Sequence, residues 1–283
     1  MTPTGSTLIP PDAQLFTESW SSALGVDART VRSRALLNLL RFDTATAADA
    51  DRIKEEIRNA AHRAAMRSSM QRWRLRGPSP ERLEAARASF HTVDSDEAEQ
   101  IIEAFHFLGY ARRSGSCFGV SVRDGAAWRL AAVLSTSPCD LNYVRPFLGR
   151  ACDDALVVTR LYSMPWAPRN TLTFLLGSVR RHLRKSRAAS MLLTFCNPNA
   201  GHRGVTYSAA GWDVLVRQRQ HRLHYVDGDY VSVRQTQWLS DTDRKRLTES
   251  RQPLQDLLIF YRAVDDRLQR VVSSPIVLES EIR

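Results

Sequence analysis

Apolar residues recur at helical spacing through the first quarter of the chain. In TVRSRALLNLLRF, residues 30–42, the apolar positions fall on one face of a helix and the arginines on the other. A second periodic run covers residues 48–76 and stops at GPSP, and ERLEAARASF, residues 81–90, predicts another short helix. The sequence therefore predicts a basic helical region over residues 15–90, after a flexible terminus rich in Pro, Thr and Ser at residues 1–14.

The pattern changes after His91, where strands begin to alternate with helices. Residues 94–110 predict an amphipathic helix that opens at Asp94 or Ser95, and residues 116–137 form two alternating runs joined by a tight turn, which predicts a strand hairpin. The remaining elements are predicted in this order: a strand at 153–163, a helix at 170–186 capped by Asn170 or Thr171, a strand at 190–197, a short helix at 205–212, strands at 213–220 and 223–235, and helices at 241–250 and 253–272.

This order of elements predicts an α/β fold. It indicates a mixed sheet with flanking helices, with a parallel strand–helix–strand unit at its centre. We expect a catalytic domain over residues 91–240, followed by a C-terminal helical segment over residues 241–283.

The charge of the chain is strongly positive, with a formal net charge of +10 and a pI of about 10.0. Such a charge favours polyanionic partners such as nucleic acid. Lysine occurs only at Lys54, Lys185 and Lys245, so arginine carries nearly all of the positive charge. Arginine suits phosphate contacts, although a GC-rich genome gives the same bias. The second N-terminal helix, which includes Arg72 and Arg74, is thus either a nucleic-acid-facing arm or a solvated helix face.

Cysteine usage and hydropathy indicate the compartment. Cys117, Cys139, Cys152 and Cys196 show no C-x-x-C pair and no zinc-finger spacing, which predicts free thiols in a reducing compartment. The sequence contains no cluster of His and acidic residues that would predict a metal site. The N-terminus lacks a basic segment followed by an apolar core, and no apolar run reaches the roughly 18 residues that a spanning helix needs. We expect a cytoplasmic protein that does not enter a membrane.

Two loops follow the carboxyl ends of the central strands, where α/β sheets bind ligands. The first loop, residues 159–171, contains Pro165 and Pro168 and leads into the N-terminus of a helix. The free N–H groups near Asn170, beside the charge of Arg169, predict a phosphate or pyrophosphate site. Proline and arginine also occur in such loops for purely structural reasons.

The second loop lies in AGHRGVTYSAAGW, residues 200–212, where Gly201 and Gly204 permit turns closed to other residues. His202 is either a general acid or base, because its ordinary pKa lies near neutrality, or a loop histidine bonded to a carbonyl. Tyr207 lies one helical turn before Gly211. Its hydroxyl either projects into a cleft between the central strands, where it donates a proton, or rests in water with the ring packed on the sheet.

The order of elements, with YSAAGWDVL after the strand at 190–197, resembles the GNAT acyltransferase fold. In that fold a Tyr-x-x-x-Gly-aromatic segment follows the fifth strand, and the acyl-CoA pyrophosphate lies on the loop after the fourth. More narrowly, TRLY…APRNTLTFLLG followed by GHRGVTYSAAGW resembles the Mom-like family of phage DNA-modification proteins. The similarity covers about residues 94–235 and is strongest over 155–215, so the N-terminal helices lie outside it.

The resemblance implies a transferase that adds a methylcarbamoyl- or acyl-type group to the exocyclic amine of adenine in DNA. Its expected cofactor is acetyl-CoA or another acyl-CoA. Carried over by motif, Arg160, His202 and Tyr207 are the expected catalytic residues, and the expected donor-binding residues are Pro168, Arg169, Asn170 and Thr171. The glycine-containing pyrophosphate loop usual in GNAT enzymes is replaced here by PWAPRN, which leaves the geometry of CoA binding open.

DNA is the expected partner under this hypothesis. The phosphates would contact basic residues of the helix at 170–186 and of the N-terminal region, namely Arg180, Arg181, Arg184, Lys185, Arg187, Arg72 and Arg74. Two alternatives stay open: a GNAT acyltransferase that acts on a small amine or a protein, and a catalytically inactive basic DNA-binding protein. The enzymatic hypotheses require Arg160, residues 168–171, His202 and Tyr207 to converge on one crevice between two splayed parallel strands.

Overall fold

The computed structural model describes residues 20, 27–67, 81–110, 115–139, 153–231, 233–266 and 276–278. The predicted flexible terminus at 1–14, residues 68–80 with Arg72 and Arg74, and Cys152 lie outside these ranges. The helices are α2 (Ala28–Leu39), α3 (Ala47–Arg67), α4 (Ser95–Phe105), α6 (Thr171–Ser186), α7 (Val205–Ala209), α8 (Val233–Thr236) and α9 (Asp241–Lys245), with 3₁₀ turns η2 (Ala85–Arg87) and η4 (Pro198–Ala200). The strands are β1 (Ala88–Val93), β2 (Cys117–Asp124), β3 (Ala127–Pro138), β4 (Leu156–Ser163), β5 (Met191–Cys196), β6 (Asp213–Gln218), β7 (His224–Val226), β8 (Asp229–Val231), β9 (Leu247–Glu249), β10 (Leu257–Ala263) and β11 (Ile276–Leu278).

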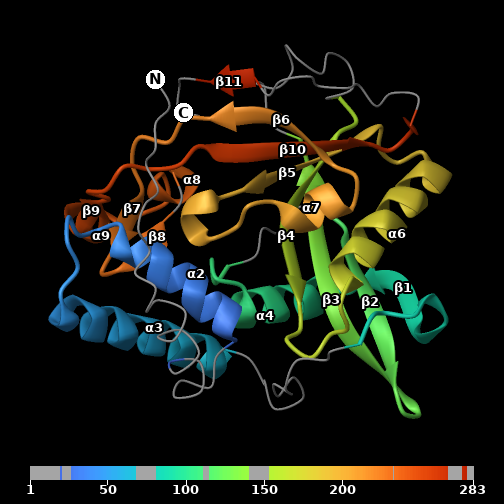
Figure 1. Ribbon diagram of the computed structural model, residues 1–283, viewed down its shortest axis with the longest axis horizontal. Helices are drawn as coiled ribbons and strands as arrows, with labels where there is room; N and C mark the ends of the chain where they lie inside the picture. Colours follow the sequence, from blue (N-terminus) through green and yellow to red (C-terminus); the bar gives the residue numbers. More distant parts are fainter. Residues whose placement is uncertain are drawn as a thin grey trace.

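Eight of these strands form one mixed sheet in the order β1-β2-β3-β4-β5-β10-β6-β11. The pairs β1–β2, β2–β3 and β3–β4 are antiparallel, whereas β4 and β5 are parallel and α6 connects them. The sequence predicted this central unit, and the α/β class with a mixed sheet and flanking helices is confirmed. Figure 1 shows that β4 turns away from the direction of β5.

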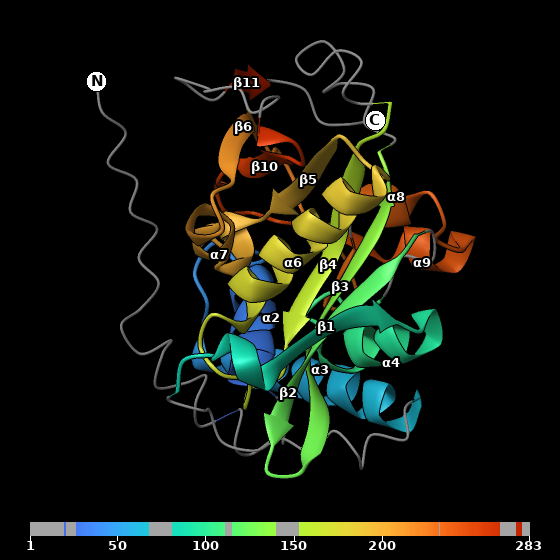
Figure 2. The same cartoon turned by 90° about the vertical axis from the view of Figure 1, so that its right-hand side faces the viewer.

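The two faces of the sheet are covered by different helices, as Figure 2 shows. On one face α6 packs on strands β2 to β4 through Leu175, Leu176 and Val179. On the other face α4 packs on β3 and β4 through Ile101 and Ile102. The core therefore forms two layers, one on each side of the sheet.

The N-terminal helices pack on the α4 side of the molecule. Helices α2 and α3 contact each other through Val31, Ile53 and Ile57. The small sheet β8-β7-β9 lies against them, since the Tyr225 hydroxyl donates to the Leu37 carbonyl at 2.6 Å. The predicted Asp-Gly turn joins β7 and β8, with both turn residues at positive φ.

Two helix predictions near the ends of the catalytic region are wrong. Residues 81–90 form a 3₁₀ turn and then β1, whose Phe90 stacks on Phe118 of β2 with ring centroids 5.9 Å apart. Residues 257–263 form β10 inside the predicted helix at 253–272, and β10 lies between β5 and β6. An interior strand is buried on both faces and shows no alternation, so its apolar run LLIFY resembles a buried helix segment.

The main sheet consequently continues past the boundary predicted at residue 240. Because β10 completes the sheet, the segment after residue 240 is not a separate helical segment in the part that the structure describes. The predicted helix at 241–250 is also only half correct, since α9 ends at Lys245 and β9 follows.

Candidate active site

The parallel strands β4 and β5 separate partway along their length. They pair from Leu156 opposite Leu192 to Val158 opposite Thr194, and the pairing ends there. At this point β4 contains a bulge, since Arg160 pairs with Ser135 of β3 and Val158 with Thr136, which leaves Thr159 as the extra residue. A bulge bends its strand, so β4 diverges from β5 immediately after the last paired residues.

Tyr207 lies at the point of this divergence. Helix α7 begins after Gly204, whose φ is 77°. A Cβ atom at Gly204 would lie 2.1 Å from the Phe260 ring, so only glycine fits this turn. The Tyr207 hydroxyl lies 3.3 Å from Oγ1 of Thr194, whose hydroxyl donates to the Val158 carbonyl at 3.1 Å. The Tyr207 hydroxyl is therefore placed at the last paired residues of β4 and β5.

The environment of Tyr207 keeps its hydroxyl protonated. The ring packs against Trp212 and Phe260, with ring centroids 5.4 and 5.6 Å away. Burial in this apolar cluster raises the pKa of Tyr207 well above its ordinary value, because the phenolate would lose its hydration. At neutral pH the side chain can donate a proton but does not act as a base.

A cavity of about 340 Å³ lies on the α6 side of this point. It is lined by Arg82, Leu83, Asn170, Thr173, Phe174 and Ala209. Asn170 has φ 69° and its side chain does not cap the helix, while the Thr171 hydroxyl donates to the Pro168 carbonyl at 2.6 Å. The side chains of Asn170 and Thr171, the two predicted caps, therefore do not accept hydrogen bonds from the first N–H groups of α6. Asn170 of the Pro-Arg-Asn bend and Ala209 of α7 line the same cavity.

The backbone of Arg169 pairs with the segment before η2. The Arg169 N–H donates to the Glu81 carbonyl at 2.8 Å, and the Leu83 N–H donates to the Arg169 carbonyl at 3.0 Å. This pairing occupies the Arg169 amide, but it also places Arg82 beside Arg169 at the N-terminus of α6, with both residues exposed. Arg82 was not among the predicted site residues, because its segment was predicted as a helix.

Arg160 is the residue that follows the bulge, and its side chain lies on the opposite face of the sheet. Its Nε donates to the Tyr110 carbonyl at 3.0 Å, and its guanidinium lies 4.4 Å from the centre of the Tyr110 ring. Arg160 and Tyr207 are thus on opposite faces of the splayed strands and do not form one continuous set of contacts. The residues predicted to converge on a single crevice therefore lie on two sides of the splayed strands.

His202 belongs to the Arg160 side. Its Nε2 lies 3.2 Å from the Ser33 hydroxyl of α2, and its ring centre is 4.9 Å from that of Phe107. Although part of the residue is exposed, this packing and the nearby charges of Arg32 and Arg29 lower the pKa of His202 to about 4. The imidazole is therefore neutral at pH 7 and is able to accept a proton.

His106 is a further site residue that the sequence analysis did not identify. Its Nδ1 accepts the Leu108 N–H at 3.2 Å. Burial, followed by the charges of Arg160, His202 and Arg34, holds its pKa well below the ordinary range. His106 is thus neutral and lies within electrostatic reach of both Arg160 and His202.

Helix α2 bridges the two diverging strands at their carboxyl ends. Asp27 caps α2 by accepting the Arg29 N–H at 3.0 Å, and it also accepts the Tyr162 hydroxyl of β4 at 2.8 Å. Arg29 donates to the Ser163 hydroxyl at 3.1 Å. One turn later, Ser33 contacts His202 after β5. These bonds join residues far apart in the sequence, so local patterns gave no signal for them.

The basic residues predicted to contact DNA on α6 fall into two groups. Arg180 and Arg184 form ion pairs with Asp266, and Arg180 Nε also donates to the Ala263 carbonyl at 2.8 Å. Arg181, Lys185 and Arg187 are exposed at the C-terminal end of α6, the end opposite the cavity. Arg72 and Arg74 lie outside the described residues.

The thiols do not supply a nucleophile at this site. Among the described residues, Cys117, Cys139 and Cys196 form no disulfide. Burial raises the pKa of Cys196 to about 11, and its thiol contacts the His202 carbonyl at 3.1 Å. Within the described ranges, no three His, Cys, Asp or Glu side chains gather as a metal site would require. Among the same residues, no helix has the length and apolar character needed to cross a bilayer.

Several solved structures that resemble this chain in fold are N-acetyltransferases. The ribosomal-protein-S18-alanine N-acetyltransferase from Escherichia coli is 11% identical with a TM-score of 0.39, over 62% of this chain and 94% of that one. Spermidine N-acetyltransferase from Vibrio cholerae, in complex with CoA and spermine, is 8% identical with a TM-score of 0.40, over 65% and 99%. Arabidopsis thaliana NAA60 in complex with acetyl-CoA is 10% identical with a TM-score of 0.38, over 62% and 98%.

A search of curated proteins gave no match to this chain. The model of the Mom protein family, in contrast, matches residues 87–263, which run from the start of β1 to the end of β10. The match includes the bulged strand β4, the N-terminus of α6 and Tyr207. The chain belongs to the Mom protein family.

Proposed function

We propose that this protein is a DNA-modifying transferase, which moves an acyl-type group from an acyl-CoA to the exocyclic amine of adenine. The observation that carries this proposal is the position of the Tyr207 hydroxyl, which lies where β4 and β5 diverge. Ala209, two residues after Tyr207 along the chain, lines the cavity at the N-terminus of α6, and the opposite face of the sheet holds the neutral histidines. A donor and an acceptor thus approach the same place from opposite faces.

The cavity on the α6 side suits the phosphates of an acyl-CoA. Among the described residues, the amides of Asn170, Leu172 and Thr173 have no hydrogen-bond partner, and they carry the positive end of the helix dipole. Arg82 and Arg169 add full positive charge beside them. When bound, the acyl-CoA supplies the activated acyl group as a thioester. These residues would bind and orient it.

The acid–base groups suit an uncharged amine as the acceptor. The exocyclic amine of adenine is neutral at physiological pH, so it has to lose a proton only as it reacts. His202 is neutral and can accept that proton at Nε2, and the protonated Tyr207 hydroxyl can return a proton to the leaving group. The adenine must leave the base stack to reach this point, at a cost of a few kcal/mol.

The DNA partner is supported by the charge of the chain and by its family. The formal net charge is +10. Arg181, Lys185 and Arg187 are exposed and suited to phosphates, whereas Arg180 and Arg184 are engaged with Asp266. Phosphate contacts of this kind position DNA without reading its sequence.

The experiment that tests this function is mass analysis of nucleosides from the DNA of cells that express the protein. We expect a heavier adenine nucleoside with the natural chain. Its amount should fall by at least about 100-fold with Tyr207→Phe, because a general acid contributes that much or more. Tyr225→Phe is the matched control, since it removes one hydroxyl that bonds to the Leu37 carbonyl away from the splayed strands. An unchanged nucleoside profile in cells that contain the folded natural protein would refute the proposal.

A further inference from the structure

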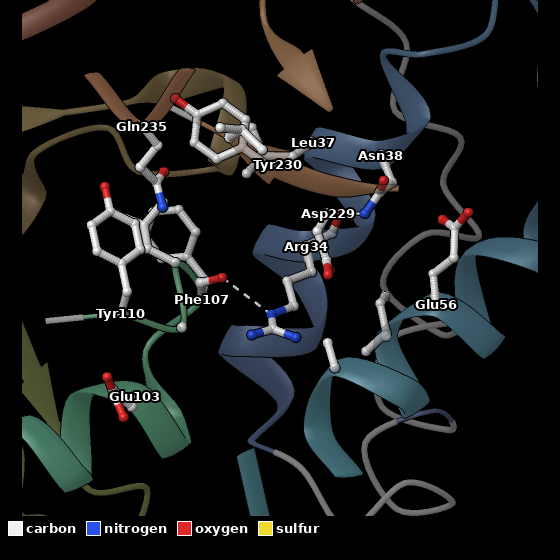
Figure 3. Close-up of a pocket in the computed structure, with 15 residues that line it drawn as sticks. Arg34, Leu37, Asn38, Glu56, Glu103, Phe107, Tyr110, Asp229, Tyr230 and Gln235 are labelled. Carbon is white, nitrogen blue, oxygen red and sulfur yellow. Dashed lines mark hydrogen bonds between the residues drawn. The ribbon is translucent and has the colours of Figure 1, made fainter. Parts of the chain in front are cut away.

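Helix α2 presents two different faces to the rest of the protein. On one face, Arg34 and Leu37 line a second cavity, of about 220 Å³ (Figure 3). The Arg34 Nε donates to the Phe107 carbonyl at 3.1 Å, and the rest of the lining includes aromatic rings and carboxylates from α3, α4 and β8. Because carboxylates repel phosphates, this face of α2 does not suit the backbone of DNA.

The other face of α2 lies against the loop between β5 and α7. The Ser33 hydroxyl lies 3.2 Å from Nε2 of His202, and a Cβ atom at Gly201 would lie 2.9 Å from Cδ1 of Leu36. Arg32 lies one helical turn before Leu36, and side chains four residues apart are neighbours on a helix surface. The packing of α2 on the loop therefore holds Arg32 beside His202.

Two arginines at this place carry charge that no described residue neutralises. Arg32 and Arg203 are exposed, and among the residues that the structure describes neither side chain forms a hydrogen bond or an ion pair. Arg29, in contrast, is paired with the buried carboxylate of Asp27 at 2.9 Å. Free guanidinium groups suit phosphates, so Arg32 and Arg203 form a positive surface around the neutral imidazole of His202.

An exposed apolar side chain follows in the same segment of the chain. Val205 is the first residue of α7 and is 75% exposed. Gly204 before it packs tightly on the Phe260 ring, and Tyr207 after it packs on the same ring, so both ends of this short segment are fixed. Proteins that unstack DNA insert apolar side chains of this kind between base pairs.

We propose that the surface defined by Arg32, His202, Arg203 and Val205 is where duplex DNA docks. Arg32 and Arg203 contact phosphates next to the target adenine, and Val205 enters the base stack at the position that the adenine leaves. The two residues proposed to act on its amine, His202 and Tyr207, belong to the same segment as Val205. This inference rests on the proposed function for the identity of the base, whereas the docking of the duplex does not require the transfer reaction.

The first test measures the affinity of the full chain for duplex DNA at several salt concentrations, without an acyl donor. Arg32→Ala combined with Arg203→Ala should reduce the slope of log affinity against log salt by about 1.8, because each phosphate contact contributes about 0.9. The matched control is Arg52→Ala combined with Arg58→Ala. It removes two exposed arginines from the neighbouring helix α3, where both form ion pairs, and should leave the slope unchanged. An unchanged slope in the Arg32 and Arg203 variant would overturn the docking surface.

The second test follows base extrusion with 2-aminopurine, an adenine analogue whose fluorescence rises when it leaves the stack. The duplex carries it at one position between random flanking base pairs. Val205→Ser should reduce the rise caused by the natural chain several-fold, whereas Val205→Leu, which keeps an apolar side chain, should retain it. Val277→Ser is the control, since it removes an exposed valine on β11. An undiminished rise with folded Val205→Ser would show that Val205 does not enter the stack.

Nucleoside analysis separates the docking surface from the proposed function. A heavier adenine made by the natural chain, with an unchanged salt slope in the Arg32 and Arg203 variant, would leave the transferase intact and remove the docking surface. The expected change in slope without a heavier adenine would keep the docking surface and remove the transferase. An equal loss of slope in the α3 control would show that the slope reports net charge alone, which would also overturn the proposal.

Discussion

The two sides of the divergence between β4 and β5 differ in their chemistry. On the α6 side, Arg82 and the N-terminal residues Asn170 and Thr173 of α6 line the cavity, and Arg169 lies beside Arg82, so this side is electropositive. On the α2 side, the cavity combines aromatic rings with carboxylates, and the neighbouring histidines are neutral. Under the proposed function, the first side would bind the phosphates of the donor and the second would face the uncharged acceptor amine.

The two sides also differ in how the chain builds them. The α6 side is built from elements of the central parallel unit. Apart from Arg82 and Leu83, the residues that line its cavity lie within the part of the chain that matches the family model. The α2 side depends on helices that attach to the sheet through Asp27, Arg29 and Ser33. The α6 side is thus formed mainly by the sheet and its connecting elements, whereas the α2 side requires the N-terminal helices to be docked.

The largest expected effect comes from undocking α2. Asp27 is 5% exposed, caps α2 and accepts the Tyr162 hydroxyl. Asp27→Ala removes the cap and leaves that hydroxyl unsatisfied, so we expect a loss of about 2–3 kcal/mol in the free energy of unfolding, measured in urea. The control is Asp49→Ala, which removes an exposed carboxylate bonded to Thr46 at the start of α3 and should cost less. An equal loss in both variants would show that Asp27 does not hold the two regions together.

The electropositive side is tested by removing its two arginines. Arg82→Ala combined with Arg169→Ala should raise the dissociation constant for acetyl-CoA about tenfold, since charge-assisted contacts to phosphate are lost. The measurement is isothermal titration calorimetry. Arg129→Ala, which removes an arginine paired with Asp124 on the hairpin, is the control. An unchanged dissociation constant in the double variant would show that the phosphates bind elsewhere.

The exposed end of α6 gives a smaller effect on DNA binding. Lys185→Ala should reduce the slope of log affinity against log salt by about 0.9, the value for one phosphate contact on duplex DNA. Arg180→Ala should leave that slope unchanged, because Arg180 is bonded to the Ala263 carbonyl and paired with Asp266. Equal slopes in Lys185→Ala and the natural chain would place the DNA elsewhere.

The smallest effect concerns the pH dependence of stability. The pKa of His202 is lowered from 6.5 to about 4 in the fold. Between these values the unfolded chain binds a proton that the folded chain does not, so stability decreases as the pH falls from 6.5 to 4. His202→Gln should make this decrease shallower in urea titrations at pH 7 and pH 4.5, and the partial exposure of His202 keeps the change small. His106 contributes in the same direction and remains in the variant. An identical decrease in both proteins would show that His202 titrates near its ordinary pKa.

Local patterns predicted the elements that form the α6 side of the site. The helix at α6, the strands β4 and β5, and the short helix with Tyr207 were all recognised from periodicity and glycine positions. The glycines at 201 and 204 do adopt positive φ. These features are encoded within a few residues of each other, which is why the sequence was sufficient.

The errors arose where a segment's structure depends on a distant neighbour. The segments at β1 and β10 were predicted as helices, but they become strands because β2, β5 and β6 pair with them. Arg82 enters the site only because Glu81 and Leu83 pair with Arg169. No local pattern contains such information, since pairing partners lie tens of residues apart.

The amino-acid sequence alone determined the central parallel unit, the glycine turn before α7 and the presence of Tyr207 and His202 beside it, because each rests on spacing within one short segment. The tertiary structure decided which side of the sheet each residue faces. The bulge at Thr159 places Arg160 opposite α6, and the docking of α2 brings Ser33 to His202. Both outcomes depend on strand register and on packing between distant segments, which are fixed only when the whole chain has folded.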